Sequence, residues 1–485
     1  MIGKRPLLIG FALLAACAAP PRRDHDLRIT PPEAWTAVEG LRDSDVTGTW
    51  WTSFDDPALS EIVALALEQN HDLQAAAARV GQAVERAKVA GAERWPSVNA
   101  GLNATRQRQN FVGFPIPGGG GDVLSTTSTR VGASLDVSWE ADLWGRLRAQ
   151  TRAAIADLDA TRADYRGGRL SLSGQTAKIW FAVAEASEQV ELARRSAESF
   201  RGLTEYVRAR FEKGVRPALD LRLAISNQAS AEAALEARLR QLDASVRQLE
   251  VLLGEYPSAR LLARFPAGAL PETPPPIPTG LPAQLVGRRP DLVAAERRLA
   301  AADQRGLSAR RALYPRLTLT ASGGTVSDQL KDLLDGDFKV WSLAGGLLQP
   351  VFQGGRLRAQ VRLADASSDQ LFEEYAAALL DAFAEVETSL AAEQYLARQE
   401  EHLTEAALQF RAAERLSEER YRNGVGGYLD VLDSQTRAFL AQSNLLELRR
   451  LRLDNRVDLH LALGGDFASE PTTAATDPAS EDDPS

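Results

Sequence analysis

The stretch "ERYRNGVGGYLDVLDSQ", residues 419–435, places a glycine-rich break between two long helical patterns, and two aspartates follow the break at once. A similar stretch, "ARFEKGVRPALDLRLAI", occurs earlier, at residues 209–225. The two match at a constant offset of 210, which also carries Leu463-Gly464 onto Leu253-Gly254. Two segments that keep register over this distance indicate a tandem duplication.

Other landmarks support the duplication. The sequence "RLRAQ" at 146–150 recurs at 356–360, again 210 residues later. Two pairs closer to the start of each copy keep an offset of 219: Asp72-Leu73 with Asp291-Leu292, and Trp95-Pro96 with Tyr314-Pro315. The difference between the two offsets predicts an insertion in the first copy. We therefore expect one architecture built from two halves.

Each half contains a long stretch without proline, from Pro117 to Pro217 and from Pro350 to Pro471. An interior proline costs a helix about 3 kcal/mol, so these stretches predict long uninterrupted helices. The first, Leu143 to Phe211, would be roughly 100 Å long at 1.5 Å per residue. Leu357 to Tyr421 repeats it. Gly167-Gly168 predicts a bend or a loosened turn in the first copy only, since the second copy has alanines there.

A second helix follows each glycine-rich break. After Pro217, apolar and long side chains recur at alternating steps of four and three residues, which is the pattern of a coiled-coil seam. Each half is therefore predicted to form a helical hairpin that turns at Gly214 or Gly424. Glycine suits the left-handed residue that ends a helix.

Four stretches between the helices alternate apolar and polar residues with period two, which predicts strands. They are "SVNAGLNAT" at 97–105, "RVGASLDVSWE" at 130–140, "PRLTLTAS" at 315–322 and the less regular "KVWSLAGGLLQPVF" at 339–352. The intervening segments 106–129 and 325–338 are predicted to be exposed loops.

The N-terminus carries a targeting signal. Residues 1–16 have a basic start and a short apolar run, too short to span a membrane, which indicates a signal peptide. Leu14-Ala15-Ala16-Cys17 resembles the bacterial lipobox, which implies cleavage before Cys17 and acylation of this cysteine. Ala18 after it points to the outer membrane. The alternative is an incidental cysteine in a signal peptide.

Composition excludes several classes of protein. Cys17 is the only cysteine, so the mature chain can form no internal disulfide. The formal net charge is −9, and removal of Lys4 and Arg5 with the signal peptide makes it more negative, which disfavours a nucleic-acid partner. The four histidines are scattered, and the sequence contains no H-E-x-x-H, G-x-S-x-G or P-loop motif. We therefore expect neither an enzyme nor a metal or cofactor site, apart from the covalent lipid.

Four strands cannot span a membrane alone, because lipid offers no hydrogen-bonding partner to an open sheet edge. Closure must come from other chains: two would give eight strands, three twelve and four sixteen. Helices about 100 Å long would then form a cylinder below the barrel, a length suited to crossing the periplasm.

The chain resembles the TolC/OprM-like outer membrane factors, in particular the NodT-type efflux lipoproteins. The similarity runs from "WWTSFDDPALSEIVALALEQNHDLQAAAARV" through "GRRPDLVAAERRLAAA" and "LYPRLTLTAS" to "RYRNGVGGYLDVLDSQ" and "LALGG". It implies a homotrimer with a twelve-stranded transmembrane β-barrel, four strands per chain, continued by a periplasmic α-helical barrel of coiled-coil hairpins. The protein would sit in outer membrane lipid.

The resemblance also implies a function. Members serve as the exit duct of tripartite efflux systems, joined through a periplasmic adaptor to an inner-membrane pump, here expected to be of the RND type. Export of small toxic compounds and export of polypeptides by a type I secretion system both remain open. A periplasmic coiled-coil scaffold without a pore is a remote alternative, which has no use for alternating strands.

Two functional regions follow. Asp430 and Asp433 match the family's paired aspartates at the periplasmic gate, and Tyr428, Leu429 and Leu432 would pack around them. The alternative is two solvated acids at a helix start, where negative charge is favourable. Gly426-Gly427 departs from the family's pattern and leaves the geometry of the rim open. The hairpin tips are predicted to dock the adaptor: Lys213, Gly214, Val215 and Arg216 in one hairpin, and Asn423, Gly424, Val425 and Gly426 in the other.

The expected organisation divides the chain into six segments. These are a signal peptide (1–16), a lipidated N-terminal segment (17–56), a first repeat (57–255), a Pro-rich linker that the resemblance places in an equatorial belt (256–282), a second repeat (283–464) and an acidic flexible tail (465–485).

Overall fold

The structure is a computed structural model that describes residues 27, 29–30, 32, 34–37, 49–112, 124–275, 277, 282 and 285–465. These residues form two compact units. The strand unit comprises Gly81–Ala160 and Ala295–Glu374, and the hairpin unit comprises Leu27–Val80, Thr161–Ala294 and the chain from Tyr375 onward. The predicted signal peptide, Cys17 and residues 466–485 of the tail lie outside the described residues.

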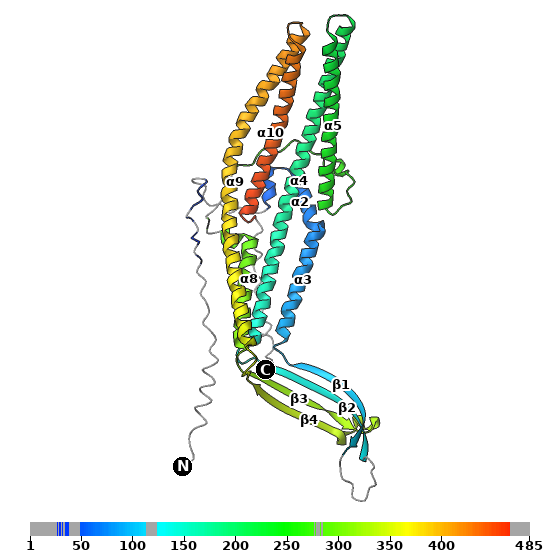
Figure 1. Ribbon diagram of the computed structural model, residues 1–485, viewed down its shortest axis with the longest axis vertical. Helices are drawn as coiled ribbons and strands as arrows, with labels where there is room; N and C mark the ends of the chain where they lie inside the picture. The colour runs from blue at the N-terminus through cyan, green and yellow to red at the C-terminus, as the bar shows by residue number, and fades with distance from the viewer. Residues whose placement is uncertain are drawn as a thin grey trace, which may run out of the picture. The chain divides into compact units, whose positions relative to one another are not determined.

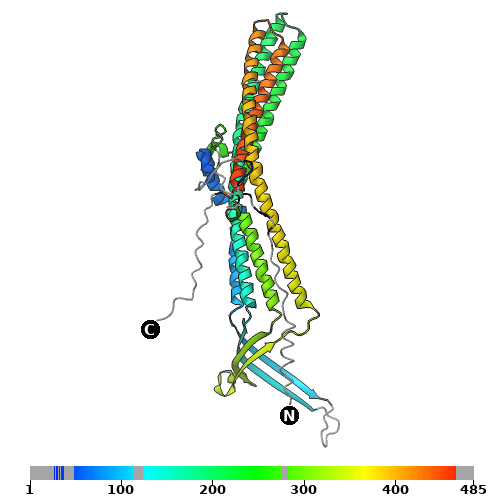
Figure 2. The same cartoon turned by 90° about the vertical axis from the view of Figure 1, so that its left-hand side faces the viewer.

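The strand unit contains one antiparallel sheet with the order β1-β2-β3-β4 (Figures 1 and 2). Its strands are β1 (Ser97–Phe111), β2 (Leu124–Ala141), β3 (Arg316–Ser327) and β4 (Lys339–Leu348). The pairing runs in one continuous register from β1 to β4. All four predicted strands are therefore present, and β1 and β4 are the two edges of the sheet.

Strands β1 and β2 are longer than the sequence predicted. Residues 106–111 and 124–129 belong to these strands, so their prediction as loop was wrong. The same holds for residues 325–327, which belong to β3, and the fourth strand ends at Leu348, not at residue 352 as predicted. The segments "RQRQN" and "STTST" pair directly across the two strands, and Arg108 donates a hydrogen bond to the hydroxyl of Ser125 (3.0 Å). Backbone pairing between polar residues needs no apolar face in water, so it leaves no period-two signal.

The other parts of the sheet alternate as predicted. One face carries apolar side chains that the single chain leaves exposed, among them Leu102 (73% exposed), Leu343 (76%) and Trp341 (83%). The opposite face is mostly polar, although Val340 and Leu348 of β4 belong to it. Exposed apolar residues on an open sheet need a nonpolar neighbour, and two unpaired edges need another strand. The strand unit is therefore incomplete as a monomer in water.

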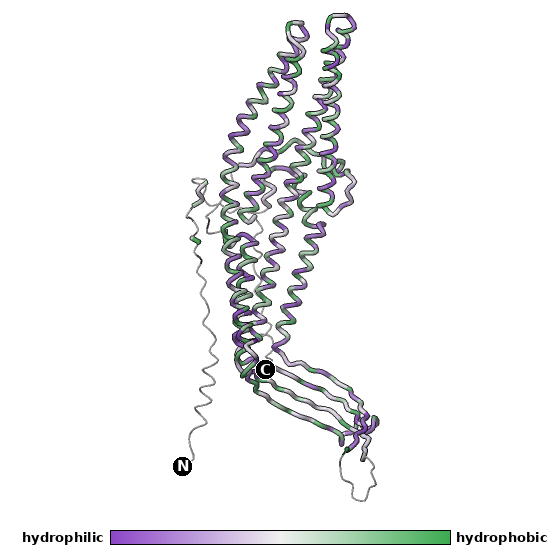
Figure 3. The backbone as a smooth tube through the Cα atoms, viewed as in Figure 1, coloured by the Kyte–Doolittle hydropathy of each residue, from purple (hydrophilic) through white to green (hydrophobic). Residues whose placement is uncertain are grey.

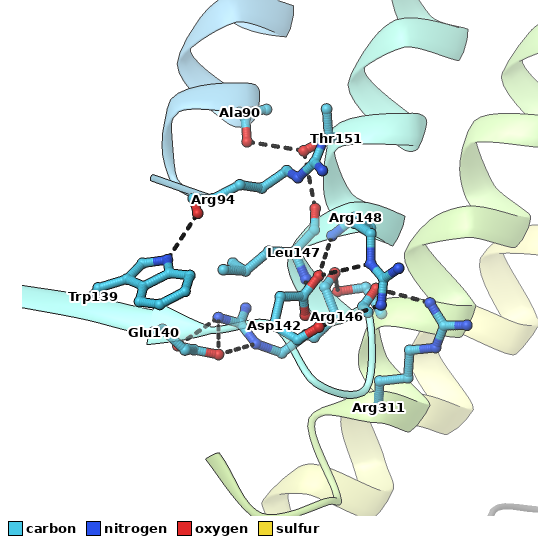
Figure 4. A network of polar contacts seen from close by, with 12 residues as sticks. Ala90, Arg94, Trp139, Glu140, Asp142, Arg146, Leu147, Arg148, Thr151 and Arg311 are labelled. Carbon is cyan, nitrogen blue, oxygen red and sulfur yellow. Dashed lines mark hydrogen bonds and ion pairs between the residues drawn. The ribbon is translucent and has the colours of Figure 1, made fainter. Parts of the chain in front are cut away.

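A short connection with several hydrogen bonds joins the end of β2 to helix α4 (Arg146–Glu212), as Figure 4 shows. The carboxylate of Asp142 accepts hydrogen bonds from the backbone amides of Leu147 (3.1 Å) and Arg148 (2.8 Å) at the helix start. These are amides that a helix leaves without an internal partner, so Asp142 acts as its N-terminal cap. Glu140 holds Arg146 through both carboxylate oxygens, each 2.9 Å from Nη2.

Neighbouring segments of the same unit hold this connection from two sides. Gly145 has a φ of +80°, a left-handed conformation that favours glycine, and its carbonyl accepts a hydrogen bond from Arg311 (2.8 Å). The indole of Trp139 donates to the carbonyl of Arg94 (2.9 Å), as Figure 4 shows. Helix α8 (Pro290–Arg311) and the turn that follows helix α3 (His71–Ala92) thus contact the last residues of β2 and the residue before α4.

The long helices reproduce the duplication. Helices α4 and α9 (Arg356–Arg422) have 67 residues each, and α5 (Ala218–Leu252) and α10 (Tyr428–Ala462) have 35 each. Both pairs begin 210 residues apart. Helices α3 and α8 have 22 residues each and begin 219 apart. Both offsets that were read from the sequence are therefore structural offsets, and the predicted tandem duplication is confirmed.

The sequence predicted a bend or a loosened turn at Gly167-Gly168, and the loosened turn is absent from α4. Both residues lie within an uninterrupted α-helix. Packing elsewhere holds α4 closely against α10, because a Cβ at Gly174 would lie 2.6 Å from a methyl group of Leu461. Tertiary packing of this kind outweighs the roughly 1 kcal/mol that each glycine costs a helix relative to alanine.

The core of the hairpin unit gathers helices α2 (Pro57–Gln69), α4, α5 and α10 around aromatic side chains. Trp50 stacks on the buried His460, with ring centroids 5.2 Å apart, and Trp180 donates a hydrogen bond to Asp56 (2.7 Å). None of the described helices is both long and apolar enough to cross a membrane. Hydrophilic residues recur along the long helices in Figure 3.

Candidate channel gate and hairpin tips

Both hairpins turn through the same backbone motif. Gly214 (φ +69°) and Gly424 (φ +80°) are left-handed residues, and the next residue in each donates back five positions, Val215 to Arg210 (2.9 Å) and Val425 to Arg420 (3.0 Å). This is the Schellman ending of a helix, as the sequence predicted for the two glycines. The hairpins turn at equivalent residues of the two repeats.

The tip residues are open to solvent in the single chain. Val215 is 57% exposed and Val425 68%, and the glycine before each has no heavy atom within 4 Å of the position of a Cβ. Arg216 and Gly426 are partly buried. The predicted docking residues therefore form two mostly exposed turns, and the glycine and valine of each turn carry little side-chain bulk.

A cluster of three tyrosines joins the two hairpins just behind these tips. Tyr206 from α4, Tyr421 from α9 and Tyr428 from α10 pack with Leu203, Val207, Ala224 and Val431. The Tyr421 ring lies 5.9 Å from each of the other two tyrosine rings, in edge-to-face geometry. We call Tyr206, Tyr421 and Tyr428 the tyrosine cluster.

Polar contacts of the tyrosine cluster also cross between the hairpins. The Tyr206 hydroxyl donates to the carbonyl of Arg422 (3.1 Å), and Asn227 lies at hydrogen-bond distance from the Tyr428 hydroxyl (3.5 Å). The Tyr421 hydroxyl is buried and has no hydrogen-bond partner among the described residues. Burial raises the pKa of Tyr421 and of Tyr428, because it disfavours the phenolate, so both stay neutral near pH 7.

Arg216 links the first tip to this cluster. Its guanidinium lies over the Tyr421 ring, 4.4 Å from the centroid, and 4.0 Å from the carboxylate of Asp220. The residue equivalent to Arg216 in the second repeat is Gly426, where a Cβ would lie only 3.2 Å from the Tyr421 amide nitrogen. The departure from the family's pattern at Gly426 therefore leaves Asp430, the equivalent of Asp220, without the arginine that its counterpart has.

The two aspartates lie one turn apart on the exposed stripe of α10, opposite the tyrosine cluster. Asp430 accepts a hydrogen bond from the Gly427 amide (3.2 Å), so it caps the helix, as the helix-start alternative predicts. Asp433 forms an ion pair with Arg437 (2.8 Å), and both side chains are more than half exposed. The structure places no cationic side chain of the described residues in an ion pair with Asp430.

The three apolar gate residues have different surroundings. Tyr428 is 3% exposed and packs inside its own chain. Leu429 is 63% exposed, and Leu432 is partly buried. Leu429 therefore shares the solvent-facing stripe with Asp430 and Asp433, where only another molecule can cover it.

Comparison with known proteins identifies the family. A profile of the outer membrane efflux protein family matches residues 62–255 and 281–465. The chain belongs to this family. The channel is 35% identical to the pyoverdine export outer membrane protein OpmQ of Pseudomonas putida, over 95% of this chain and 97% of OpmQ. It is 28% identical to the probable outer membrane lipoprotein SilC of Salmonella typhimurium, over 86% of this chain and 87% of SilC.

Solved structures give the same result. The outer-membrane channel OprN superposes on the chain with a TM-score of 0.82 at 26% identity, covering 92% of this chain and 99% of OprN. The predicted fold class is therefore confirmed: a trimeric outer membrane channel in which each chain supplies four barrel strands and two long helical hairpins. The outer membrane location is also confirmed. The scaffold alternative is wrong, because the family forms channels.

Proposed function

We propose that three copies of this chain form the exit duct of a tripartite efflux system. The observation that carries the proposal is the four-stranded sheet, whose two open edges and exposed apolar face are incomplete in one chain. Closing it with two further copies supplies edge partners and turns the apolar face to lipid. The channel then conducts solutes across the outer membrane and needs no catalytic residue or cofactor.

The proposed partners are a periplasmic adaptor and an inner-membrane pump of the RND type. The two exposed tips support this arrangement, since a 67-residue helix separates each tip from the strand that precedes it. Roughly 100 Å of helix suits a duct that meets its partner inside the periplasm. Small residues at both tips would let the helices of an adaptor approach closely.

Small molecules are the favoured cargo. OpmQ, which covers nearly the whole chain, is named for export of pyoverdine, and TtgF of Pseudomonas putida, 32% identical over 89% of this chain, is named for efflux of toluene. A polypeptide duct of a type I secretion system is the second candidate, and it uses the same channel architecture. In both cases the pump would select the substrate. Greater susceptibility of a deletion strain to small toxic compounds would support small-molecule export over polypeptide export.

The proposed gate is the stripe of α10 that carries Leu429, Asp430 and Asp433. In a trimer this stripe can meet its copies around the three-fold axis, where carboxylates repel and Leu429 finds apolar partners. The tyrosine cluster lies on the other side of α10 and ties the two hairpins of one chain together. Adaptor docking at the tips could shift this balance, which need differ by only a few kcal/mol between open and closed states.

A lipid on Cys17 is the proposed anchor. One relative, SilC, is named as an outer membrane lipoprotein. Replacing Cys17 with serine should abolish metabolic labelling by palmitate, because the acylated thiol is lost, while the trimer still forms through its barrel. Incorporation of labelled palmitate measures acylation, and crosslinking in membranes measures trimer formation. Continued labelling of the serine variant would show that the anchor lies elsewhere.

Large side chains at the two tip glycines test whether the adaptor docks at the hairpin tips. Replacing Gly214 and Gly424 together with tryptophan should lower efflux at least about tenfold, since a large side chain in a left-handed position strains the turn and blocks a close partner. Minimum inhibitory concentrations and dye efflux report the loss. Trimer crosslinking and thermal unfolding check that assembly survives.

A matched control uses Gly202, a helical glycine with no heavy atom within 4 Å of the position of a Cβ. Its replacement by tryptophan should change efflux little, because it lies inside α4, several turns before the tip. Full transport with tryptophan at both tips would place adaptor docking on another surface and would argue against the proposed duct arrangement.

A further inference from the structure

The polar face of the sheet carries one row of side chains that crosses all four strands. Asn99 on β1 lies opposite Asp136 on β2, Asp136 lies opposite Ser322 on β3, and Ser322 lies opposite Ser342 on β4. Residues paired in this way project to the same face of a sheet. Asp136 is the only charged residue in the row.

Two hydroxyls hold the Asp136 carboxylate in place. Ser134 donates a hydrogen bond to Oδ2 (2.8 Å) from the same strand, and Ser322 donates to Oδ1 (2.6 Å) from the neighbouring strand. The side chain nevertheless remains exposed. The carboxylate is therefore fixed in direction and still accessible to solutes that pass this face.

No basic side chain on the same face compensates its charge within the described strands. The register gives this face three other charged residues: Arg130, Glu140 and Arg316. The carboxylate of Glu140 is already held by Arg146. Arg130 and Arg316 lie six residues along the strands on either side of the Asp136 row, about 20 Å away at 3.3 Å per residue. That distance exceeds the Debye length of ~8 Å at physiological ionic strength.

We propose that Asp136 determines charge selectivity in the barrel, favouring cationic over anionic solutes. The polar face must line the lumen, because a charged side chain on the lipid face of a barrel costs up to a few kcal/mol at the middle of the bilayer and little near its surface. The opposite face carries the apolar residues, and its charged residues, Arg106, Arg108 and Lys339, lie towards the ends of the strands that are joined by the β1–β2 and β3–β4 connections. The inference rests on the proposed trimeric duct, which brings three copies of Asp136 to one level of the pore. Three carboxylates around a water-filled channel raise the local cation concentration.

The test is a reversal-potential measurement on single channels in planar bilayers under a KCl gradient. In about 100 mM salt, where the Debye length is ~10 Å and the two arginines remain screened from the carboxylate, Asp136→Asn should lower the cation-to-anion permeability ratio at least about twofold. Asp136→Lys should lower it further. Ser322→Ala, which keeps the carboxylate, and Asp337→Asn, in the connection between β3 and β4, should leave the ratio near the parent value.

Thiol modification tests the orientation separately. Asp136→Cys should react with hydrophilic methanethiosulfonates added to conducting channels. A sulfonated reagent should restore the cation preference, and a trimethylammonium reagent should lower it. The proposal would be overturned if the channels still conduct but the cysteine does not react. It would also be overturned if the asparagine and lysine variants keep the permeability ratio of the parent. Loss of all conductance in the parent protein would instead count against the proposed duct.

Discussion

Replacing Tyr421 with alanine is expected to raise the resting conductance of the assembled trimer. Tyr421 is fully buried, and its ring contacts both other members of the tyrosine cluster and the guanidinium of Arg216. Truncating a buried aromatic side chain to alanine typically costs about 3–5 kcal/mol. Because the Tyr421 ring holds the two hairpins of a chain together near the tips, its removal loosens them there.

The expected rise in open probability depends on how much of this loss of packing energy is specific to the closed state. If about 2 kcal/mol of the lost packing is specific to that state, the open population rises roughly 30-fold. Single-channel recording in planar bilayers measures the open probability directly. Sensitivity of whole cells to large antibiotics such as vancomycin gives a second readout, because a leaky duct admits compounds that the outer membrane normally excludes.

Two conservative variants separate packing from hydrogen bonding. Tyr421→Phe removes a buried hydroxyl that has no partner among the described residues, so the channel should stay closed and be as stable as the parent. Tyr206→Phe loses the hydrogen bond to the Arg422 carbonyl, worth about 1 kcal/mol, and should show an intermediate open probability. Equal conductance of the Tyr421→Ala channel and the parent would show that the tyrosine cluster does not hold the gate.

The sequence predicted the long helices well because their signals are local. Absence of proline and a repeated glycine indicated rods ending at Phe211 and Tyr421, and α4 and α9 end one residue later, at Glu212 and Arg422. The same logic failed where tertiary context decides. The glycine pair in α4 leaves the helix intact, and polar residues extend β1 and β2 beyond the alternating segment.

The gate was predictable only in part. The position of the aspartates followed from the repeated motif, but the arginine that pairs with Asp433 was not foreseen, although Arg437 lies one helical turn later. Comparing the repeats position by position would have shown that Gly426 replaces Arg216. The tyrosine cluster could not be found this way, because Tyr206 and Tyr421 meet across more than two hundred residues of sequence.

Replacing both Asp430 and Asp433 with alanine is expected to remove most of the block of the channel by divalent cations and to weaken its cation preference. The two carboxylates lie on the exposed stripe of α10, so a trimer brings six of them to the constriction proposed here. Oxygen ligands and concentrated negative charge are what hard divalent cations prefer. In planar bilayers, the Mg²⁺ concentration that gives half-inhibition of the current should rise about tenfold or more. This weaker block is equivalent to roughly 1.4 kcal/mol of lost binding free energy.

The contacts in the structure sharpen this test. Arg437 neutralises part of the charge of Asp433, so Arg437→Ala should shift both properties the opposite way, towards tighter block and a stronger cation preference. Asp430 has no such cation and also caps α10, hence Asp430→Ala alone should account for most of the lost block and for a small loss of helix stability. Leu429→Ala should instead raise resting conductance with the block retained, since it removes packing and keeps the carboxylates. A double alanine channel with the parent's cation selectivity and the parent's Mg²⁺ sensitivity would show that these aspartates are only solvated acids at a helix start.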